Sequence, residues 1–245
     1  KAGEFKMYLQ PQISAKTRRL TGAEALVRRI KPDGTIISPI DFIPVYEKSG
    51  LISRLDRYIW EQAAAKLGEW KKAGINMSIS VNISPKDFYY IDIFNTFAGL
   101  IKKYDIEPSN LKIEITETTI MSDVPNLMGE LEELRKAGFT LEMDDFGSGY
   151  SSLNTLKDIN VDVLKVDMGF IKETKNVKKS RIILASVIKM AKELNLLIIT
   201  EGVETEEQVD NLTKLGCDVF QGYYFSKAID VNEFEKRYLY RKKAG

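Results

Sequence analysis

Histidine is absent from this 245-residue sequence, and cysteine occurs once, at Cys217. Without histidine there is no Ser-His-Asp or Cys-His catalytic apparatus, and a single cysteine excludes a disulfide within the chain. The ligands that zinc prefers are missing as well, so a bound metal would need oxygen ligands, as Mg²⁺, Mn²⁺ and Ca²⁺ do. Cys217, in the stretch LGCDVF, is expected to be a small buried apolar residue.

A strong charge of either sign and a long apolar run are also missing. The chain has 36 lysine and arginine residues against 35 aspartate and glutamate residues, so no overall basic field favours a DNA or RNA duplex as partner. No run of 18 apolar residues and no signal-peptide pattern occurs. We therefore expect a cytoplasmic domain, and the sequence leaves open whether a longer protein would anchor it to a membrane.

Short β-rich apolar runs alternate with longer segments of helical period. The expected strands are 5–11, 76–84, 111–117, 139–145, 161–167, 196–202 and 217–225. The expected helices are 55–74, 94–105, 124–138, 180–195 and 205–216. This alternation favours an α/β fold with parallel βαβ units closed into a barrel of about eight strands, with a doubly wound open sheet as the alternative.

Helix ends carry recognisable signals. Gly74, Gly138 and Gly216 are expected to be left-handed residues that end helices, and Thr205 with Gln208 is expected to form a capping box. No linker or fixed-period repeat is visible, so residues 1–245 are interpreted as one domain. The first apolar run begins close to the N-terminus, which suggests a piece of a longer multidomain protein.

Almost every expected strand ends in a polar side chain. In barrels of parallel strands the carboxyl ends of the strands carry the chemistry, so these side chains are candidates for one site. They are Gln10, Asn82, Glu114, Asp144, Asp145, Lys165, Asp167, Glu201 and Gln221. Surface solvation accounts for a single polar strand end, but it does not readily account for one on nearly every strand.

Alternation of side chains along a strand refines this set. Lys165 and Asp167 share a face, whereas Glu114 and Glu117 do not, so Glu117 is expected to support a loop. Asp144 and Asp145 are neighbours and would point to opposite faces of a straight strand. Both can point into one site only if the strand ends there and the backbone turns through Gly147 and Gly149.

Carboxylates gathered at one point repel one another, and a pair of divalent cations would resolve this repulsion. The residues by themselves thus predict a metal-dependent barrel with oxygen ligands, but no substrate. Two alternatives remain at this point. The carboxylates could cap helices or pair with lysines, and Lys165 could form a Schiff base as in barrel aldolases, although such an enzyme has no use for this collection of carboxylates.

Eight ordered sequence blocks resemble one known family. They are LQPQ at 9–12, EALVR at 24–28, VNIS at 81–84, EITE at 114–117, DDFGSGYSSL at 144–153, LKVD at 164–167, EGVET at 201–205 and QGYYFSK at 221–227. The chain is similar in these blocks to EAL domains, the cyclic-di-GMP phosphodiesterases. A lone E-A-L tripeptide would mean little, whereas eight blocks in order are a strong signal.

The resemblance implies a modified (β/α)8 (TIM) barrel whose first strand runs antiparallel to the others. It implies hydrolysis of one phosphodiester bond of cyclic-di-GMP to linear 5'-pGpG with two Mg²⁺ or Mn²⁺ ions, and Ca²⁺ is expected to inhibit. The implied ligands of one metal are Glu24, Asn82, Glu114 and Asp144. The other would be held by Asp144 and Asp145, with Glu201 close by, and Lys165 would contact the attacking water.

Further roles follow from the same resemblance. Substrate contacts are expected from Gln10, Leu26, Arg28 and Gln221. Supporting roles around the loop are expected from Glu117, Asp167 and Glu204, although Glu204 could equally be an ordinary residue of the first turn of a helix. Members of the family are often homodimers fused to regulatory domains, and we expect both here.

Two other functions compete with the enzyme. One is a catalytically silent receptor that binds cyclic-di-GMP, and the other is a metal-dependent phosphodiesterase for a different nucleotide. Inactive family members usually lose metal-site residues, the lysine or the loop. All of these are retained here, which favours the active enzyme.

Overall fold

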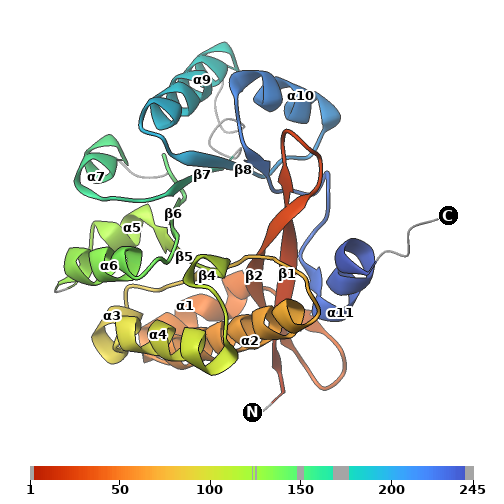
Figure 1. Cartoon of the computed structure of the whole chain (residues 1–245), viewed down its shortest axis with the longest axis vertical. Helices are drawn as coiled ribbons and strands as arrows, with labels where there is room; N and C mark the ends of the chain where they lie inside the picture. The colour runs from red at the N-terminus through yellow and green to blue at the C-terminus, as the bar shows by residue number, and fades with distance from the viewer. Residues whose placement is uncertain (1–2, 123, 125, 148–151, 168–176, 241–245) are drawn as a thin grey trace.

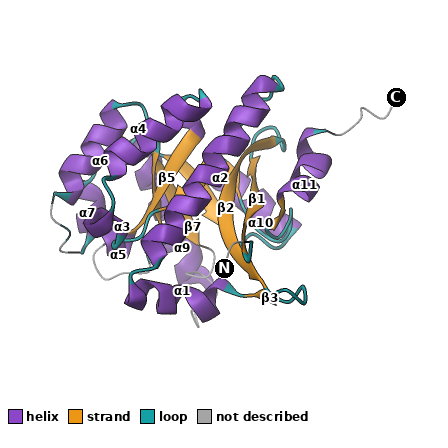
Figure 2. Ribbon diagram, turned by 90° about the horizontal axis from the view of Figure 1, so that it is seen from below, coloured by secondary structure: helices purple, strands orange, loops and turns teal. Residues whose placement is uncertain are grey.

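The computed structural model describes residues 3–122, 124, 126–147, 152–167 and 177–240. Within them, strands and helices alternate, and helices surround a central ring of strands (Figures 1 and 2). The strands are β1 (Phe5–Ser14), β2 (Leu20–Ile30), β3 (Ile36–Ile37), β4 (Ile79–Asn82), β5 (Leu111–Thr116), β6 (Leu141–Asp144), β7 (Val163–Asp167), β8 (Leu197–Glu201), β9 (Val219–Phe220) and β10 (Ile229–Asp230).

Eight of these ten described strands close into a barrel. Strands β2, β4, β5, β6, β7, β8 and β9 pair in parallel in that order, and β1 pairs antiparallel with both β2 and β9. The predicted barrel with an antiparallel first strand is therefore confirmed, and the open-sheet alternative is wrong. The sequence analysis did not include β2 among its strands, because this strand carries no clean two-residue alternation of apolar and polar side chains.

The helices lie outside the strands, and each of the five long helices expected from the sequence is present. They are α1 (Pro39–Ser49), α2 (Ile52–Lys72), α3 (Asp87–Tyr90), α4 (Ile93–Tyr104), α5 (Glu117–Ile120), α6 (Leu127–Lys136), α7 (Ser152–Asp158), α9 (Val177–Glu193), α10 (Glu206–Leu215) and α11 (Val231–Phe234). The sequence analysis missed α1 and the short helices α3, α5, α7 and α11. Short segments carry too few turns to show a helical period.

Helix ends follow the predicted signals. Gly74, Gly138 and Gly216 have φ values of 73°, 93° and 96°, the left-handed conformation that glycine adopts without steric cost. Thr205 accepts a hydrogen bond from the Gln208 backbone, and the Gln208 side chain accepts one in return from the Thr205 backbone, which is the predicted capping box.

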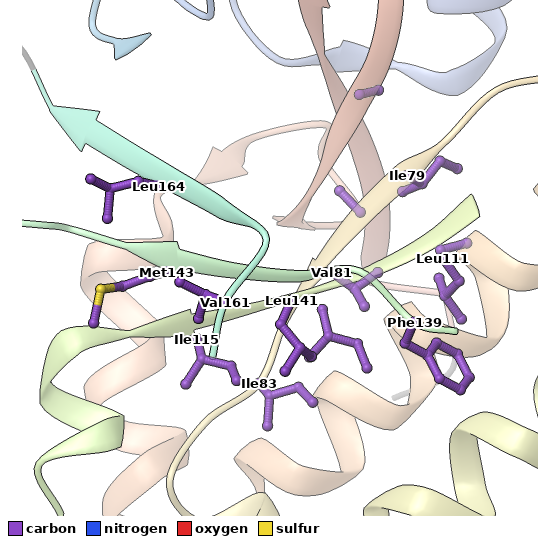
Figure 3. Close-up of a cluster of buried hydrophobic side chains, with 14 of the residues drawn as sticks. Ile79, Val81, Ile83, Leu111, Ile115, Phe139, Leu141, Met143, Val161 and Leu164 are labelled. Carbon is purple, nitrogen blue, oxygen red and sulfur yellow. The ribbon is translucent and has the colours of Figure 1, made fainter. Parts of the chain in front are cut away.

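The hydrophobic core lies between the outer face of the barrel and the helices. Because strand residues alternate, every second side chain points outward, and these side chains are apolar. Figure 3 shows this layer around β4 to β7, where Ile79, Val81, Leu111, Leu141 and Leu164 pack among the helices. Each of these five side chains is fully buried. The core therefore fixes which strand residues are left to face the barrel axis.

The inward-facing positions are unusually polar for a barrel interior. Val163, Ile199 and Val219 form a small separate apolar cluster on neighbouring strands. Many other side chains with inward parity are polar, among them the buried Gln12 and Glu142, and Lys112 of β5 forms an ion pair of 2.9 Å with Glu142 of β6. The polar side chains of the barrel interior extend to the carboxyl ends of the strands, where the candidate site lies.

Cys217 is buried, as expected, and its thiol lies 3.1 Å from the hydroxyl of Thr200. Burial raises the pKa of this thiol to about 11, so it stays protonated at neutral pH. Among the described residues, no helix combines the length and the apolar character needed to cross a membrane.

Candidate functional site

The side chain of Lys165 lies at the centre of the site. Lys165 is on β7 and is fully buried, and its Nζ lies among four carboxylates from four other strands. Nζ lies 2.9 Å from Glu201 Oε1, 3.4 Å from Asp144 Oδ1 and 3.5 Å from Glu24 Oε2, and it donates a hydrogen bond to Glu114 Oε1. The structure thus brings together residues that lie up to 177 positions apart in the chain.

Strand register places three pairs of predicted site residues directly opposite each other on neighbouring strands. Glu24 pairs with Gln10 across β1 and β2, Asn82 pairs with Glu114 across β4 and β5, and Asp167 pairs with Glu201 across β7 and β8. Asn82 also donates a 3.4 Å hydrogen bond to Glu24 Oε1. Because paired residues share a face of the sheet, backbone pairing alone aims their side chains toward the barrel axis.

A chain of glutamines holds Glu24 from the other side. Gln221 directly follows β9, and its Nε2 donates a hydrogen bond to Glu24 Oε2 and lies 3.4 Å from Gln10 Oε1. Gln12 in turn donates a 3.2 Å hydrogen bond to Gln221 Oε1. Gln12 is almost completely buried, and the sequence analysis did not select it. Its position two residues after Gln10 on one strand face was the available signal.

The electrostatics of the site show more negative charge than Lys165 can neutralise. Burial and the neighbouring Glu24 raise the pKa of Glu114 well above its usual value, and burial raises the pKa of Glu201 to about 8. Burial would also raise the pKa of Asp144, but the positive charge of Lys165 outweighs it and keeps that pKa below its usual value. The four carboxylates hold the pKa of Lys165 well above normal against the effect of burial.

Asp144 and Asp145 lie where the strand ends, as predicted. β6 ends at Asp144, and Asp145 has a left-handed φ of 55°, followed by Gly147 with a φ of 97°. The left-handed residue breaks the strand alternation, which is the condition under which both carboxylates can turn to one side. Burial and the charge of Asp144 raise the pKa of Asp145. Gly149, the second glycine of the expected turn, lies outside the described residues.

The donor set fits divalent cations of the hard, oxygen-preferring kind. It consists of carboxylates and one amide, and Glu114 Oε2 and Asp144 Oδ1 are buried without a hydrogen-bond partner. Among the described residues, however, no three acidic side chains stand ready to hold an ion between them, because the ammonium group of Lys165 lies at the centre of the cluster. Metal binding at this cluster would therefore require the contact between Lys165 and Glu114 to change.

The predicted supporting residues lie at the edge of the site. Glu117 is buried and is the first residue of α5, whose N-terminus is capped by Thr116. The predicted contact of Glu117 with the loop 148–151 lies outside the described residues. Asp167 ends β7, and Glu204 directly precedes the N-cap of α10, so it is not a residue of the first helical turn. Both line a cavity beside the site.

Two cavities meet at the cluster, and Glu24 and Leu26 of β2 line both of them. The first, which we call the base-side cavity, has a volume of about 320 Å³ and opens toward α1 and α2. The glutamine-side cavity, about 400 Å³, opens toward the segments that follow β7, β8 and β9 and is lined by Gln10, Glu201, Gln221 and Tyr223 among others. The predicted ligand residues Gln10, Leu26 and Gln221 are thus all cavity residues.

Arg28 lies two residues beyond Leu26 on the same strand. Its guanidinium carbon lies 6.0 Å from the centroid of the Tyr8 ring, and its NH1 donates a 2.9 Å hydrogen bond to the Val27 carbonyl. Burial lowers the pKa of Arg28 from its ordinary value, yet the group remains a permanent cation. A half-buried cation beside the two cavities is suited to an anionic ligand.

The base-side cavity contains residues that the sequence analysis missed. Its walls are mostly apolar, and Glu47 of α1 and Asp56 of α2 bring carboxyl groups into it. Asp56 follows Ile52 by four residues and precedes Trp60 by four, so it lies on the buried face of α2. An acidic residue on an otherwise apolar helix face was a signal available in the sequence.

The fold and the site define the class of protein: an α/β barrel with an antiparallel first strand and a carboxylate cluster at the carboxyl ends of its strands. The sequence model of the EAL domain family matches residues 1–228. The chain belongs to the EAL domain family.

Similar proteins support this assignment. The chain is 37% identical over 232 residues to the signaling protein YkoW of Bacillus subtilis, covering 95% of the chain and 29% of YkoW. It is 36% identical to PdeG of Escherichia coli, a probable cyclic di-GMP phosphodiesterase, covering 98% of the chain and 48% of PdeG. A structure of the PaMucR phosphodiesterase in complex with c-di-GMP has a TM-score of 0.87 and 33% identity, with 94% of each chain covered. The chain thus spans less than half the length of these two curated relatives.

Proposed function

We propose that this domain hydrolyses one phosphodiester bond of cyclic-di-GMP to linear 5'-pGpG in a reaction that depends on two divalent cations, Mg²⁺ or Mn²⁺. The observation that carries the proposal is the pair of cavities that meet at the carboxylate cluster. Cyclic-di-GMP has two bases at opposite ends of a ring that contains two phosphates. A ligand of that shape would place a base in each cavity and a phosphate over the cluster between them.

The chemistry of the cavities suits guanine. The base-side cavity offers apolar walls, including Leu26 and Ile59, for the faces of a planar ring, and the Asp56 carboxyl at one side. A carboxylate accepts hydrogen bonds from the N1–H and N2–H groups that guanine presents along one edge. The glutamine-side cavity offers amide groups of Gln10 and Gln221 and the exposed ring of Tyr223. Arg28 nearby would neutralise phosphate charge.

The carboxylate cluster would hold the cations. Glu24, Asn82, Glu114 and Asp144 would bind one ion and Asp144 and Asp145 the other, and a pair of such ions activates a water and stabilises charge on the phosphoryl oxygens. In this arrangement Lys165 keeps a proton on Nζ, and it orients the attacking water by donating to it. Glu201, whose Oε1 lies 2.9 Å from Nζ, would accept a hydrogen bond from the ammonium group and so hold it toward the water.

The silent receptor is the alternative that the assay must separate from the enzyme. Incubation of the domain with cyclic-di-GMP and Mg²⁺ or Mn²⁺, followed by chromatography, is expected to yield pGpG. Ca²⁺ is expected to support binding with little product, since its larger and more flexible shell positions water less strictly. Tight binding with no pGpG in any of the three metals would establish the receptor instead.

A matched pair of variants tests the assigned site in the same assay. Glu24→Gln removes a charge shared by both cavities and by the cluster, and we expect it to lower turnover at least about 100-fold, the scale of losses on removing a transition-state contact. Glu61→Gln removes an equivalent charge from the pair that Glu61 forms with Lys103 on the outside of the barrel. Equal turnover in both variants would contradict the assignment of Glu24.

A further inference from the structure

A buried pair of carboxyl groups lies behind the wall of the base-side cavity. Asp56 of α2 lines the cavity, and Asp87, the first residue of α3, lies directly behind it and is fully buried. A hydrogen bond joins the two carboxyl groups. Since an ionised carboxyl can only accept hydrogen bonds, one of the two must hold a proton for this bond to exist.

Asp87 is held so that it can only serve as the acceptor of the pair. Its Oδ2 accepts a 2.7 Å hydrogen bond from the backbone N–H of Ser84. The side chains of Ser53 and Asp56 also form hydrogen bonds with Asp87, and both favour its ionised form. The backbone donor favours the ionised form of Asp87, which leaves the shared proton on Asp56.

The groups around the pair also favour a protonated Asp56 and an ionised Asp87. Burial and the charge of Asp87 raise the pKa of Asp56 to about 9, and Glu47 of α1 adds to the effect. Burial raises the pKa of Asp87 to about 6. The described lining of this cavity contains Glu24 and Glu47 besides Asp56, and no lysine or arginine, so no cation favours ionisation of Asp56 from within it.

We infer that Asp87 is a positioning and specificity residue: by holding a proton on Asp56 in the empty cavity, it couples the binding of a guanine base there to the release of one proton. The inference rests on the proposed function. When guanine enters, its N1–H and N2–H groups need an acceptor, so Asp56 gives its proton to solvent and accepts two hydrogen bonds from the base. The charge on Asp56 then exists only while the base compensates it.

The coupling also bears on the choice of base. Adenine presents an acceptor, N1, beside its amino donor, so the protonated form of Asp56 would meet adenine without losing its proton. A guanine dinucleotide therefore gains affinity as pH rises toward 9, whereas the adenine analogue does not. The pair Asp56 and Asp87 thus makes discrimination between the two bases depend on pH.

Titration calorimetry tests the coupling directly. The domain, saturated with Ca²⁺, is titrated with cyclic-di-GMP at pH 7.5 in Tris and in HEPES, whose different ionisation enthalpies report the number of protons released. Chromatography of the recovered sample checks that no pGpG has formed. We expect the wild type to release more protons than Asp87→Asn, and its affinity to rise about tenfold per pH unit between pH 7 and 8.5. The variant lacks the Asp87 charge that helps to hold the proton on Asp56, so its profile should be flatter.

The two variants distinguish failure of this inference from failure of the proposed function. Asp87→Asn keeps an acceptor for the Ser84 N–H and leaves the cluster around Lys165 intact, so protons released by that cluster are common to both proteins. Asp56→Asn, a neutral mimic of the protonated residue, should bind more weakly and without this proton release. Equal proton release in wild type and Asp87→Asn, with binding intact, would overturn the inference and leave the proposed function standing. Failure of the wild type to bind at all would overturn both.

Discussion

At the scale of single residues, Lys165 decides the state of the site. Its ammonium group is fully buried and lies against four carboxylates, so it is the counter-charge that lets those carboxylates be buried together. The same group lies where the acidic side chains converge, and we therefore expect it to compete with a divalent cation for them. Stability and metal affinity are opposed through this one side chain.

Lys165→Met tests this opposition. In EDTA the variant should lose about 3 kcal/mol of unfolding free energy, because removing one partner leaves buried carboxylates without compensation. Mn²⁺ should then raise its midpoint of thermal unfolding more than that of the wild type. Lys103→Met is the control, since Lys103 forms an exposed pair that solvent screens and that contributes little to stability. Unchanged stability of Lys165→Met in EDTA would show that the carboxylates are compensated by other means.

At the scale of elements, backbone hydrogen bonds join the segments that follow β8 and β9, and these segments form one wall of the glutamine-side cavity. Val203 N donates to the Gln221 carbonyl at 3.2 Å, and Tyr224 N donates to the Val203 carbonyl at 3.0 Å. Gly222 lies between them, and a Cβ at this position would come within 2.1 Å of the Val203 carbonyl oxygen. Glycine is required here for the close approach of two backbones.

Gly222→Ala is therefore expected to force the two segments apart, lowering the free energy of unfolding by about 2 kcal/mol or more and weakening cyclic-di-GMP binding. Gly99→Ala is the matched control. Gly99 lies within α4, a Cβ there meets nothing within 4 Å, and the substitution should stabilise the protein by about 0.5–1 kcal/mol. Chemical denaturation of both variants, with calorimetric binding, measures the difference. Similar stabilities would contradict the proposed role of the close approach.

Prediction from sequence succeeded best for the long elements. Segments such as 205–216 carry a cap, a helical period and a terminal glycine, so three local signals agree. The element β2 was missed although it carries Glu24, since a strand whose inner face meets a polar barrel interior shows no simple alternation. The base-side cavity was missed for a different reason. Its walls come from α1, α2 and β2, and only the packing of these elements shows that Asp56 and Leu26 face one space.

At the scale of the whole molecule, the buried acids make stability depend on pH. Folding raises the pKa of Asp56 to about 9, of Glu201 to about 8 and of Asp87 to about 6, all above their usual values near 4. The folded state therefore binds these protons more tightly than the unfolded state. Their contribution to stability is complete below about pH 4 and is lost as pH rises through each folded-state pKa.

The metal-free protein should accordingly be less stable at pH 8.5 than at pH 6, by up to about 6 kcal/mol, since Asp56 and Glu201 each contribute up to about 1.4 kcal/mol per pH unit below their folded-state pKa. Urea unfolding in EDTA at the two pH values measures this difference. Mn²⁺ should reduce it by taking over the role of the protons at Glu201 and its neighbours. A stability that rises with pH in EDTA would contradict the assigned shifts.

Composition and motif order were sufficient to identify the family of this protein and the donor types open to a metal, because residue types are local properties. The absence of histidine and the near absence of cysteine restrict a metal site to oxygen donors, and the eight ordered blocks identify the EAL domain family. Three-dimensional packing settled the state of each group, because burial and distance depend on residues remote in the chain. Only the closed barrel places Lys165 among Glu24, Glu114, Asp144 and Glu201, and only the packing of α2 on α3 places Asp87 behind Asp56.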